Sequence, residues 1–175
     1  QAAMLDESSY EGNSFFASGF AEIRFLKDFT FSSVNTVNLT ETRSTSVQNG
    51  YYGNYASSNG IVYKGHSRNL DYSLLQQLNW AHKFGKHNVD VMLGHEYNKR
   101  TSYSLSASKN NMFDPNNNEL NGAITDQSNS GSSRSIYNTE GFFGRAQYDY
   151  NYKYFLSASF RRDASSRFSK EDGRW

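Results

Sequence analysis

The sequence predicts an all-β fold: an antiparallel transmembrane β-barrel segment of about six strands in three hairpins, with short periplasmic turns and long extracellular loops. Three observations predict it. Side chains alternate between apolar and polar with a period of two, short turns alternate along the chain with long loops rich in Ser and Asn, and aromatic residues gather beside the short turns.

Composition favours folded β-structure over disorder. The 175 residues include 26 Ser, 19 Asn and 13 Gly, but the net charge is only +1, aromatic residues make up 16 %, and there is one Pro. The absence of Cys excludes a disulfide framework and a catalytic thiol. A net charge near zero gives no long-range attraction to nucleic acid, and no apolar run reaches the roughly 18 residues of a transmembrane helix.

The alternation defines the first hairpin. Between Phe15 and Leu26 the odd positions are apolar and the even positions include Glu22 and Arg24. Lys27 and Asp28 interrupt the pattern, and a second alternating run follows. The pattern recurs twice more, and we expect strands near 14–26, 29–42, 72–84, 88–107, 139–150 and 154–163, the fourth being the longest.

The connections separate a barrel from its main alternative, a soluble β-sandwich. The two long connections, 43–71 and 108–138, are far longer than the short turns. The aromatic residues beside the short turns suit an interfacial girdle, which a sandwich does not need: Phe25, Phe29, Trp80, Phe84, Tyr148, Tyr150, Tyr152 and Tyr154.

The strand faces predict which side chains meet lipid and which meet water. We expect these to point to lipid: Ile23, Val37, Leu78, Val91, Ala146 and Leu156. Glu22, Gln77, Asp90, Arg145 and Ser157 are expected to point to the lumen. The charged residues predicted to face the lumen are Glu22, Arg24, Asp90, Glu96, Arg145, Asp149, Arg161 and Asp163. We interpret most of them as cross-strand pairs, with a substrate path as the alternative.

The first long loop holds candidate contacts for a substrate or partner: Tyr51, Tyr52, Tyr55 and Tyr63. Their rings could stack on sugars or pack on a protein, and the alternative is that they pack the loop itself.

Metal and catalytic sites are not expected. No two of His66, His82, His87 and His95 have the spacing of a helix or strand metal site. Asp114, Asn116 and Asn118 copy the first offsets of a calcium loop, but Glu119 stands where that loop needs Gly, so we predict an Asn-rich turn. The triplet at Asn38 resembles a glycosylation site but lies in a predicted strand. With no nucleophile–base pair and no cofactor motif, an enzyme is not expected.

The C-terminal third resembles a known family. Glu140-Gly-Phe-Phe-Gly-Arg145 and the residues to Tyr150, followed by 153–168 and 173–175, resemble the mid-barrel signature of the SusC/RagA family, the TonB-dependent outer-membrane transporters of the Bacteroidetes. Residues 15–23 with the turn at 26–29 are similar to that family's barrel strands. Ala164 departs from a position that is more often Gly, and the long loops match weakly.

The resemblance implies the kind of barrel to which this chain belongs, its activity and its partners. Such transporters have barrels of about 22 strands around an N-terminal plug. We therefore expect 1–175 to be a partial β-barrel domain from the middle of the barrel, with no plug domain and no signal peptide in this chain. The implied activity is import of glycan or peptide nutrients across the cell outer membrane. The implied partners are a SusD-like surface lipoprotein and the TonB complex acting through the plug.

Two other functions stay open. One is a siderophore or cobalamin receptor of the same fold. The other is a soluble carbohydrate-binding or adhesin β-domain, which would need no detergent. If the chain is a barrel segment, its six strands form an open sheet, and its edge strands should pair with other β-strands.

Overall fold

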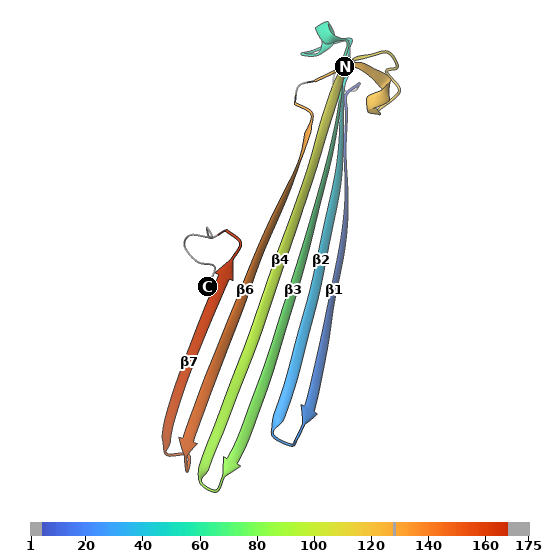
Figure 1. The fold of residues 1–175 in the computed structure, drawn as a ribbon. Coiled ribbons are helices and arrows are strands. Elements are labelled where there is room, and N and C mark those ends of the chain that lie inside the picture. Colours follow the sequence, from blue (N-terminus) through green and yellow to red (C-terminus); the bar gives the residue numbers. More distant parts are fainter. Residues whose placement is uncertain (1–4, 128, 168–175) are drawn as a thin grey trace. The chain divides into compact units, whose positions relative to one another are not determined.

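The fold, taken from a computed structural model that describes residues 5–127 and 129–167, is one antiparallel sheet (Figure 1). Its strands are β1 (Glu7–Phe25), β2 (Phe29–Gln48), β3 (Ile61–Phe84), β4 (His87–Met112), β5 (Ala123–Asp126), β6 (Gly131–Tyr150) and β7 (Tyr154–Ser165). Two single-turn 3₁₀ helices lie at Ala56–Ser58 and Leu120–Gly122. The strand order is β1-β2-β3-β4-β6-β7, with β5 paired to β4, so the sheet is not closed and β1 and β7 are its edges. The predicted fold class is confirmed.

The strands are longer than predicted. The longest is β4 with 26 residues, as expected, but β2 continues to Gln48 and β3 begins at Ile61. The first long loop therefore shrinks to 49–60, and the second to 113–122 and 127–130 around β5. Ser and Asn are common in turns, but the ladder of a wide sheet holds them extended here, because strand propensity depends on context.

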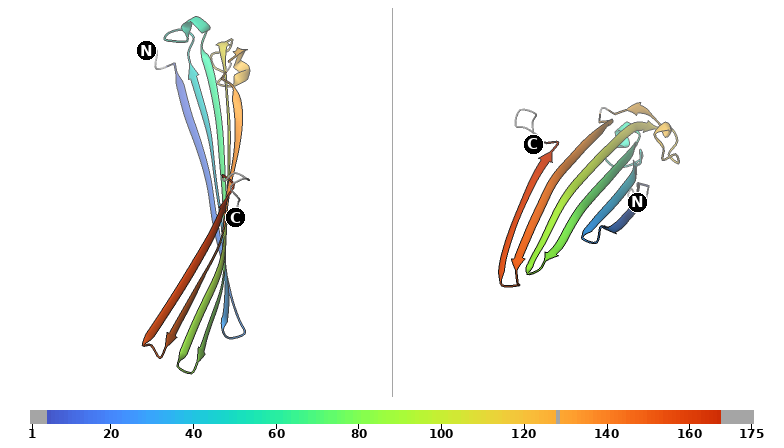
Figure 2. Two further views of the ribbon diagram at one scale, coloured as in Figure 1. Left: turned by 60° about the vertical axis from the view of Figure 1, so that its left-hand side comes forward. Right: turned by 60° about the horizontal axis from the view of Figure 1, so that its bottom comes forward.

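Three short turns join the long strands into hairpins (Figure 2). Leu26 and Lys27 have φ of 48° and 63°, and Asn151 and Tyr152 have φ of 49° and 58°. Consecutive left-handed residues match the twist of the flanking strands, as in primed turns. The last turn fixes the register of β6 and β7 from Tyr150↔Tyr154 to Thr139↔Ser165.

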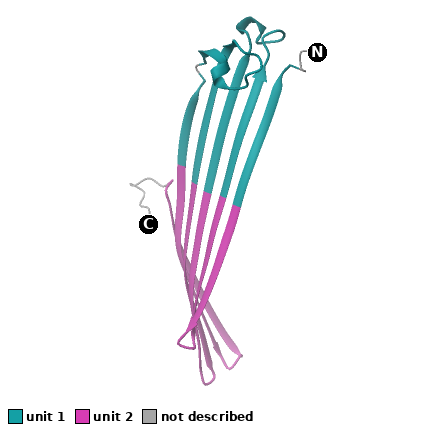
Figure 3. Cartoon of the chain, turned by 90° about the vertical axis from the view of Figure 1, so that its right-hand side faces the viewer, with its two compact units in different colours: residues 1–15, 39–70, 101–135 teal, residues 16–38, 71–100, 136–175 magenta. Residues whose placement is uncertain are grey.

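The chain divides into two compact units (Figure 3). Unit 1 comprises residues 1–15, 39–70 and 101–135, and unit 2 comprises 16–38, 71–100 and 136–175. Unit 1 has a small apolar core of Val47, Val62, Met112 and Ala123, with Leu120 packed against it. In unit 2 the described residues of both edge strands are exposed up to Asp163. Among the described residues, no helix has the length and hydropathy needed to cross a bilayer.

Residues 168–175 lie outside the described part of the chain. The ends of the sequence signature at Phe168, Gly173 and Trp175 fall there. Ala164, the departure from the family pattern, is 7 % exposed.

Candidate functional site

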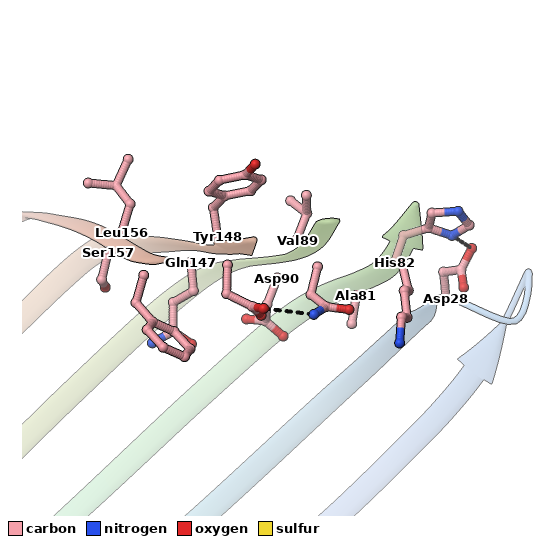
Figure 4. A pocket seen from close by; sticks show the side chains of 13 residues that line it. Asp28, Ala81, His82, Val89, Asp90, Gln147, Tyr148, Leu156 and Ser157 are labelled. Carbon is pink, nitrogen blue, oxygen red and sulfur yellow. Dashed lines mark hydrogen bonds and ion pairs between the residues drawn. The ribbon is translucent and has the colours of Figure 1, made fainter. Parts of the chain in front are cut away.

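The strands of unit 2 present two chemically different faces. Figure 4 shows Val89, Tyr148 and Leu156 rising from one side of the sheet, with Asp90, Gln147 and Ser157 projecting from the other. The register agrees, because Tyr148 pairs with Leu156 and Gln147 with Ser157. We call these the apolar face and the charged face.

Strand alternation assigns the predicted residues to the two faces. The charged face carries all eight residues that were predicted to face a lumen: Glu22, Arg24, Asp90, Glu96, Arg145, Asp149, Arg161 and Asp163. The apolar face carries Ile23, Val37, Leu78, Val91, Ala146 and Leu156. Which of these faces meets water stays a prediction at this point.

Arg161 organises one network on the charged face. Its guanidinium contacts Glu96 at 2.8 Å and Asp163 at 2.9 Å. It also lies over the ring of Phe143, 5.4 Å from the centroid, a cation–π geometry. The Phe143 ring in turn covers the buried Gly94, where a Cβ atom would come within 2.2 Å of ring atoms. The network ties β4, β6 and β7 together, although each exposed ion pair alone contributes little.

Asp90 lies in a second network on the same face. Asn79 donates a hydrogen bond to Asp90 Oδ2 at 3.2 Å. Asp90 Oδ1 is shielded from solvent and accepts no hydrogen bond, and the Arg145 guanidinium lies 4.0 Å away. That separation permits Coulomb attraction but is too long for a hydrogen bond. Nearby, Asn88 donates to Asp149 at 2.8 Å. Of these residues, Asn88, Asp90 and Asp149 border an open depression of about 720 Å³ that also reaches Phe155.

The ion pair between Arg100 and Asp71 in unit 2 was not predicted from the sequence. Arg100 Nε lies 2.6 Å from Asp71 Oδ1 and a second contact to Oδ2 is 3.3 Å. Asp71 stood at the end of a predicted loop, so no strand alternation assigned it a face or a partner. The extension of β3 beyond its predicted start places Asp71 on a strand, opposite Arg100 of β4.

Aromatic side chains gather beside the short turns on the apolar face of unit 2. Phe25 and Phe29 stack at 5.4 Å, and Phe29 lies 6.4 Å from Trp80. Trp80 also contacts Phe84 at 6.3 Å. The clustering that the sequence indicated is therefore present.

The histidines each bridge to a neighbouring element. In unit 2, His82 contacts Asp28 at 2.8 Å, His95 contacts Glu140 at 2.9 Å and His87 contacts the Tyr148 hydroxyl at 2.7 Å. In unit 1, His66 contacts Glu41 at 2.8 Å. Within the described ranges, no three His, Asp or Glu side chains come together as a metal site would require.

The four candidate tyrosines do not form one cluster. Tyr51 and Tyr52 are adjacent and exposed at 64 % and 61 %, whereas Tyr55 is half-buried. Tyr63 lies on β3, so its assignment to the loop was wrong: strand pairing begins at Ile61. The functional role of all four stays a prediction.

Asn49 fixes the loop that carries the exposed pair. Its Oδ1 accepts the backbone N–H groups of Tyr51 and Tyr52 at 2.9 and 3.0 Å. Its own side-chain and backbone N–H groups donate to Asp6 Oδ1 at 2.7 and 2.9 Å. Gly50 packs so closely on Asn59 that a Cβ atom would lie 2.7 Å from its backbone carbon. The two rings therefore stand on an ordered loop.

Asp6 makes this loop sensitive to acid. Donation from the Asn49 backbone and side chain lowers the pKa of Asp6 below its ordinary value of 3.8. A lowered folded-state pKa contributes stability above the ordinary pKa, and this stability is lost as pH falls through the folded value. We expect pepsin to cleave the 49–60 loop increasingly fast as pH drops below about 4. In the Asp6→Asn variant residue 6 cannot titrate, so its cleavage rate should change with pH only as the activity of pepsin itself changes. The same pH profile in the parent protein and in the variant would contradict the role assigned to Asp6.

The second connection is an Asn-rich turn. Asp114 Oδ1 accepts the Asn116 N–H at 3.0 Å, and Asn117 Oδ1 accepts the Glu119 N–H at 3.0 Å. Asn118 donates to Glu7 on β1. Two of the three side chains that copied a calcium loop, those of Asp114 and Asn118, are thus used in hydrogen bonds within unit 1, which agrees with the predicted Asn-rich turn.

Comparison with known proteins identifies the fold. No family model matches the chain, and no curated protein matches it by sequence. Among solved structures it is similar to the RagAB peptide transporter, with TM-score 0.85, 24 % identity and 97 % of this chain covered. It is also similar to the RagAB peptide importer in the "open-open" state, with TM-score 0.79, 25 % identity and 95 % covered. The ferric citrate transporter FecA gives TM-score 0.52 at 9 % identity over 89 % of the chain.

These neighbours are TonB-dependent outer-membrane transporters with β-barrels, and RagA is SusC-like. The resemblance to the SusC/RagA family is confirmed at the level of the fold. The chain spans 19 % of the length of the RagAB chains and 21 % of the FecA chain.

Proposed function

We propose that residues 1–175 are a partial β-barrel domain, from the middle of the barrel of a TonB-dependent transporter that imports nutrients across the outer membrane. The observation that carries the proposal is the separation of unit 2 into an apolar and a charged face on strands with the fold of such a barrel. In this class of protein the outer band is apolar and the lumen is polar.

The apolar face is the one that meets lipid. On β1, β2 and β3 of unit 2 it carries no Asp, Glu, Lys or Arg among the described residues. An Arg or Lys at the bilayer midplane costs about 2–4 kcal/mol, so the Arg161 and Asp90 networks belong in the wet lumen. The aromatic cluster beside the short turns then lies at the periplasmic interface.

The edge strands β1 and β7 pair with neighbouring strands of the same barrel. Their unpaired N–H and C=O groups would each cost several kcal/mol in hydrocarbon. A plug and a TonB contact would come from other parts of the transporter, and a SusD-like surface lipoprotein would act above the extracellular loops. Support for this partner is the likeness to RagAB structures and the family resemblance of 140–167.

Peptides are the favoured nutrient. Two neighbours are peptide importers by name and match at TM-scores of 0.84 and 0.79, against 0.52 for the ferric citrate transporter. A glycan substrate is the alternative that the family resemblance leaves.

Uptake by the parent organism tests the proposal. Cells lacking the gene should lose uptake of a labelled mixture of short peptides, and cells lacking TonB should lose it to the same extent. Labelled oligosaccharides and ferric siderophores serve as parallel probes. Loss of oligosaccharide uptake alone would replace peptide by glycan, and loss of siderophore uptake alone would favour the receptor alternative. A protein that purifies without detergent would contradict the barrel itself.

A further inference from the structure

The strands of unit 1 have one face without charge. It is formed by the even-numbered residues of β1, of β2 and of β4 as far as Asn110, and by the odd-numbered residues of β3 and β6. Among the described strand residues of unit 1, these positions hold no Asp, Glu, Lys, Arg or His. Hydroxyl groups dominate, for example Thr42, Ser44, Ser67, Ser104, Ser106 and Ser133. We call this surface the neutral wall.

The charged strand residues of unit 1 occupy the opposite positions. Lys64 and His66 on β3 and Glu41 and Arg43 on β2 alternate with the wall residues. They pair among themselves and with the 113–122 loop: His66 lies 2.8 Å from Glu41, and Lys64 lies 2.7 Å from Glu119. Charge is therefore abundant in unit 1 but confined to one side of its strands.

The pattern along β4 makes the contrast plain. Its even-numbered residues include Asp90, Glu96 and Arg100, and then, from residue 102 to 108, only Ser. Asn111 is the first residue of β4 with a positive φ, so alternation is uninterrupted before it and these serines lie on the same side of β4 as Asp90, Glu96 and Arg100. The change from charged to hydroxyl side chains occurs within one strand.

Hydroxyl groups of the neutral wall are held by local contacts. Ser104 and Ser133 share a hydrogen bond of 2.8 Å between β4 and β6. Ser108 is 1 % exposed and donates to Asn129 at 2.7 Å. Ser44 Oγ fills the space above Gly65, 2.5 Å from where a Cβ atom would stand. Fixed hydroxyl groups can donate and accept without imposing a charge on what they contact.

We propose that the neutral wall lines the part of the substrate path formed by unit 1 and makes that part indifferent to the net charge of the peptide carried. This inference rests on the proposed function and deepens it. Hydroxyl groups bind the main-chain N–H and C=O groups that every peptide shares. A single fixed charge would favour one sign of side chain, because hydrogen bonds to ionised groups are roughly twice as strong as neutral ones. Peptides differ widely in charge, and a neutral wall accepts all of them.

The same surface is poorly suited to selective sugar binding. Sugar hydroxyl groups donate their strong, charge-assisted hydrogen bonds to carboxylates, and the neutral wall contains no carboxylate. Tyr10 and Tyr63 are its only aromatic rings among the described strand residues, so platforms for ring stacking are few.

Ser106 is the position for a test. It is half-buried on the wall, and within the described part of the chain its side chain makes no hydrogen bond. Ser106→Asp adds one negative charge, and Ser106→Asn adds a side chain of the same shape without charge. Both variants are made in the full-length transporter in its native membrane, with surface levels matched. The probes are three labelled pentapeptides of net charge −2, 0 and +2.

The parent and Ser106→Asn should take up the three peptides at rates within about twofold of each other. Ser106→Asp should favour the cationic over the anionic peptide by about fivefold or more, a ratio that corresponds to roughly 1 kcal/mol. The preference should shrink at high salt because exposed charges are screened. A parent that already discriminates strongly by charge, or an Asp variant that behaves like the Asn variant, would overturn the neutral-wall inference. A parent that takes up none of the peptides would instead contradict the proposed function.

Discussion

Replacing Val91 by Arg should destabilise the barrel by about 2–4 kcal/mol. Val91 lies on β4 in the apolar face of unit 2, four residues from the short turn, in the band assigned to the hydrocarbon. An arginine there must either bury its charge in lipid or distort the strand to reach water. The cost is read from urea unfolding of the full-length transporter in lipid vesicles, followed by the loss of its compact electrophoretic form.

Met92→Arg is the matched control. Met92 is the next residue on the same strand and lies on the charged face. Its Arg side chain would enter the wet lumen, where substitutions affect selectivity more than stability. We expect less than about 1 kcal/mol of loss. Equal costs for the two variants would contradict the assignment of one face to lipid, and a larger cost for Met92→Arg would show that the faces have been assigned the wrong way round.

Gly94→Val should destabilise by about 1–3 kcal/mol, although valine is a better strand former than glycine. Strand propensity alone predicts a gain of up to about 1 kcal/mol. Packing opposes it, because the Phe143 ring occupies the position of a Cβ atom at Gly94, within 2.2 Å. The valine must push the ring aside and so separate it from the Arg161 guanidinium.

A double-mutant cycle isolates that clash. Phe143→Ala removes the ring, so Gly94→Val in that background should cost far less than in the parent and could become stabilising. The expected coupling is in the range of about 0.5–3 kcal/mol for residues in contact. Additive effects would mean that Phe143 does not cover Gly94 in the folded transporter.

The sequence was sufficient to predict the hairpins and faces of unit 2. Apolar and charged residues alternate there with few exceptions, as in the run from Phe15 to Arg24. A period of two is enough to assign sides, because a strand has only two faces. The eight charged residues assigned to one face of the sheet therefore lie together, although the sequence could not give their partners, such as Glu96 with Arg161.

Unit 1 was harder to predict, because on much of its strands one type of polar residue alternates with another and not with an apolar residue. From Thr101 to Ser108, β4 alternates Ser with Tyr, Leu and Ala, but the corresponding parts of β2 and β3 resemble loop sequence. Their extended conformation depends on ladders formed with neighbouring strands, which local sequence does not encode. The same is true of β5, whose four residues are held by pairing from Lys109↔Asp126 to Met112↔Ala123.

Contacts between residues far apart in the sequence, such as those of Gly94 and Asn49, could not be predicted either. Nothing in the sequence around Gly94 indicates that a ring from β6, some 50 residues away, lies across it. Likewise, the contact of Asn49 with Asp6 joins residues 43 positions apart. Such contacts follow from strand order, so they become visible only when the sheet is assembled.

Cysteine scanning along β4 shows which of its faces meets water. These 175 residues contain no Cys, so each substitution introduces the segment's single thiol, and any Cys elsewhere in the transporter is first replaced by Ser. Single Cys variants at positions 88 to 93 of the full-length transporter, in its native membrane, are treated with a charged, membrane-impermeant thiol reagent. We predict labelling at Asn88, Asp90 and Met92 and protection at Val89, Val91 and Leu93. Labelling without a period of two, or with the opposite phase, would contradict the assignment of this chain to a membrane barrel with its charged face in the lumen.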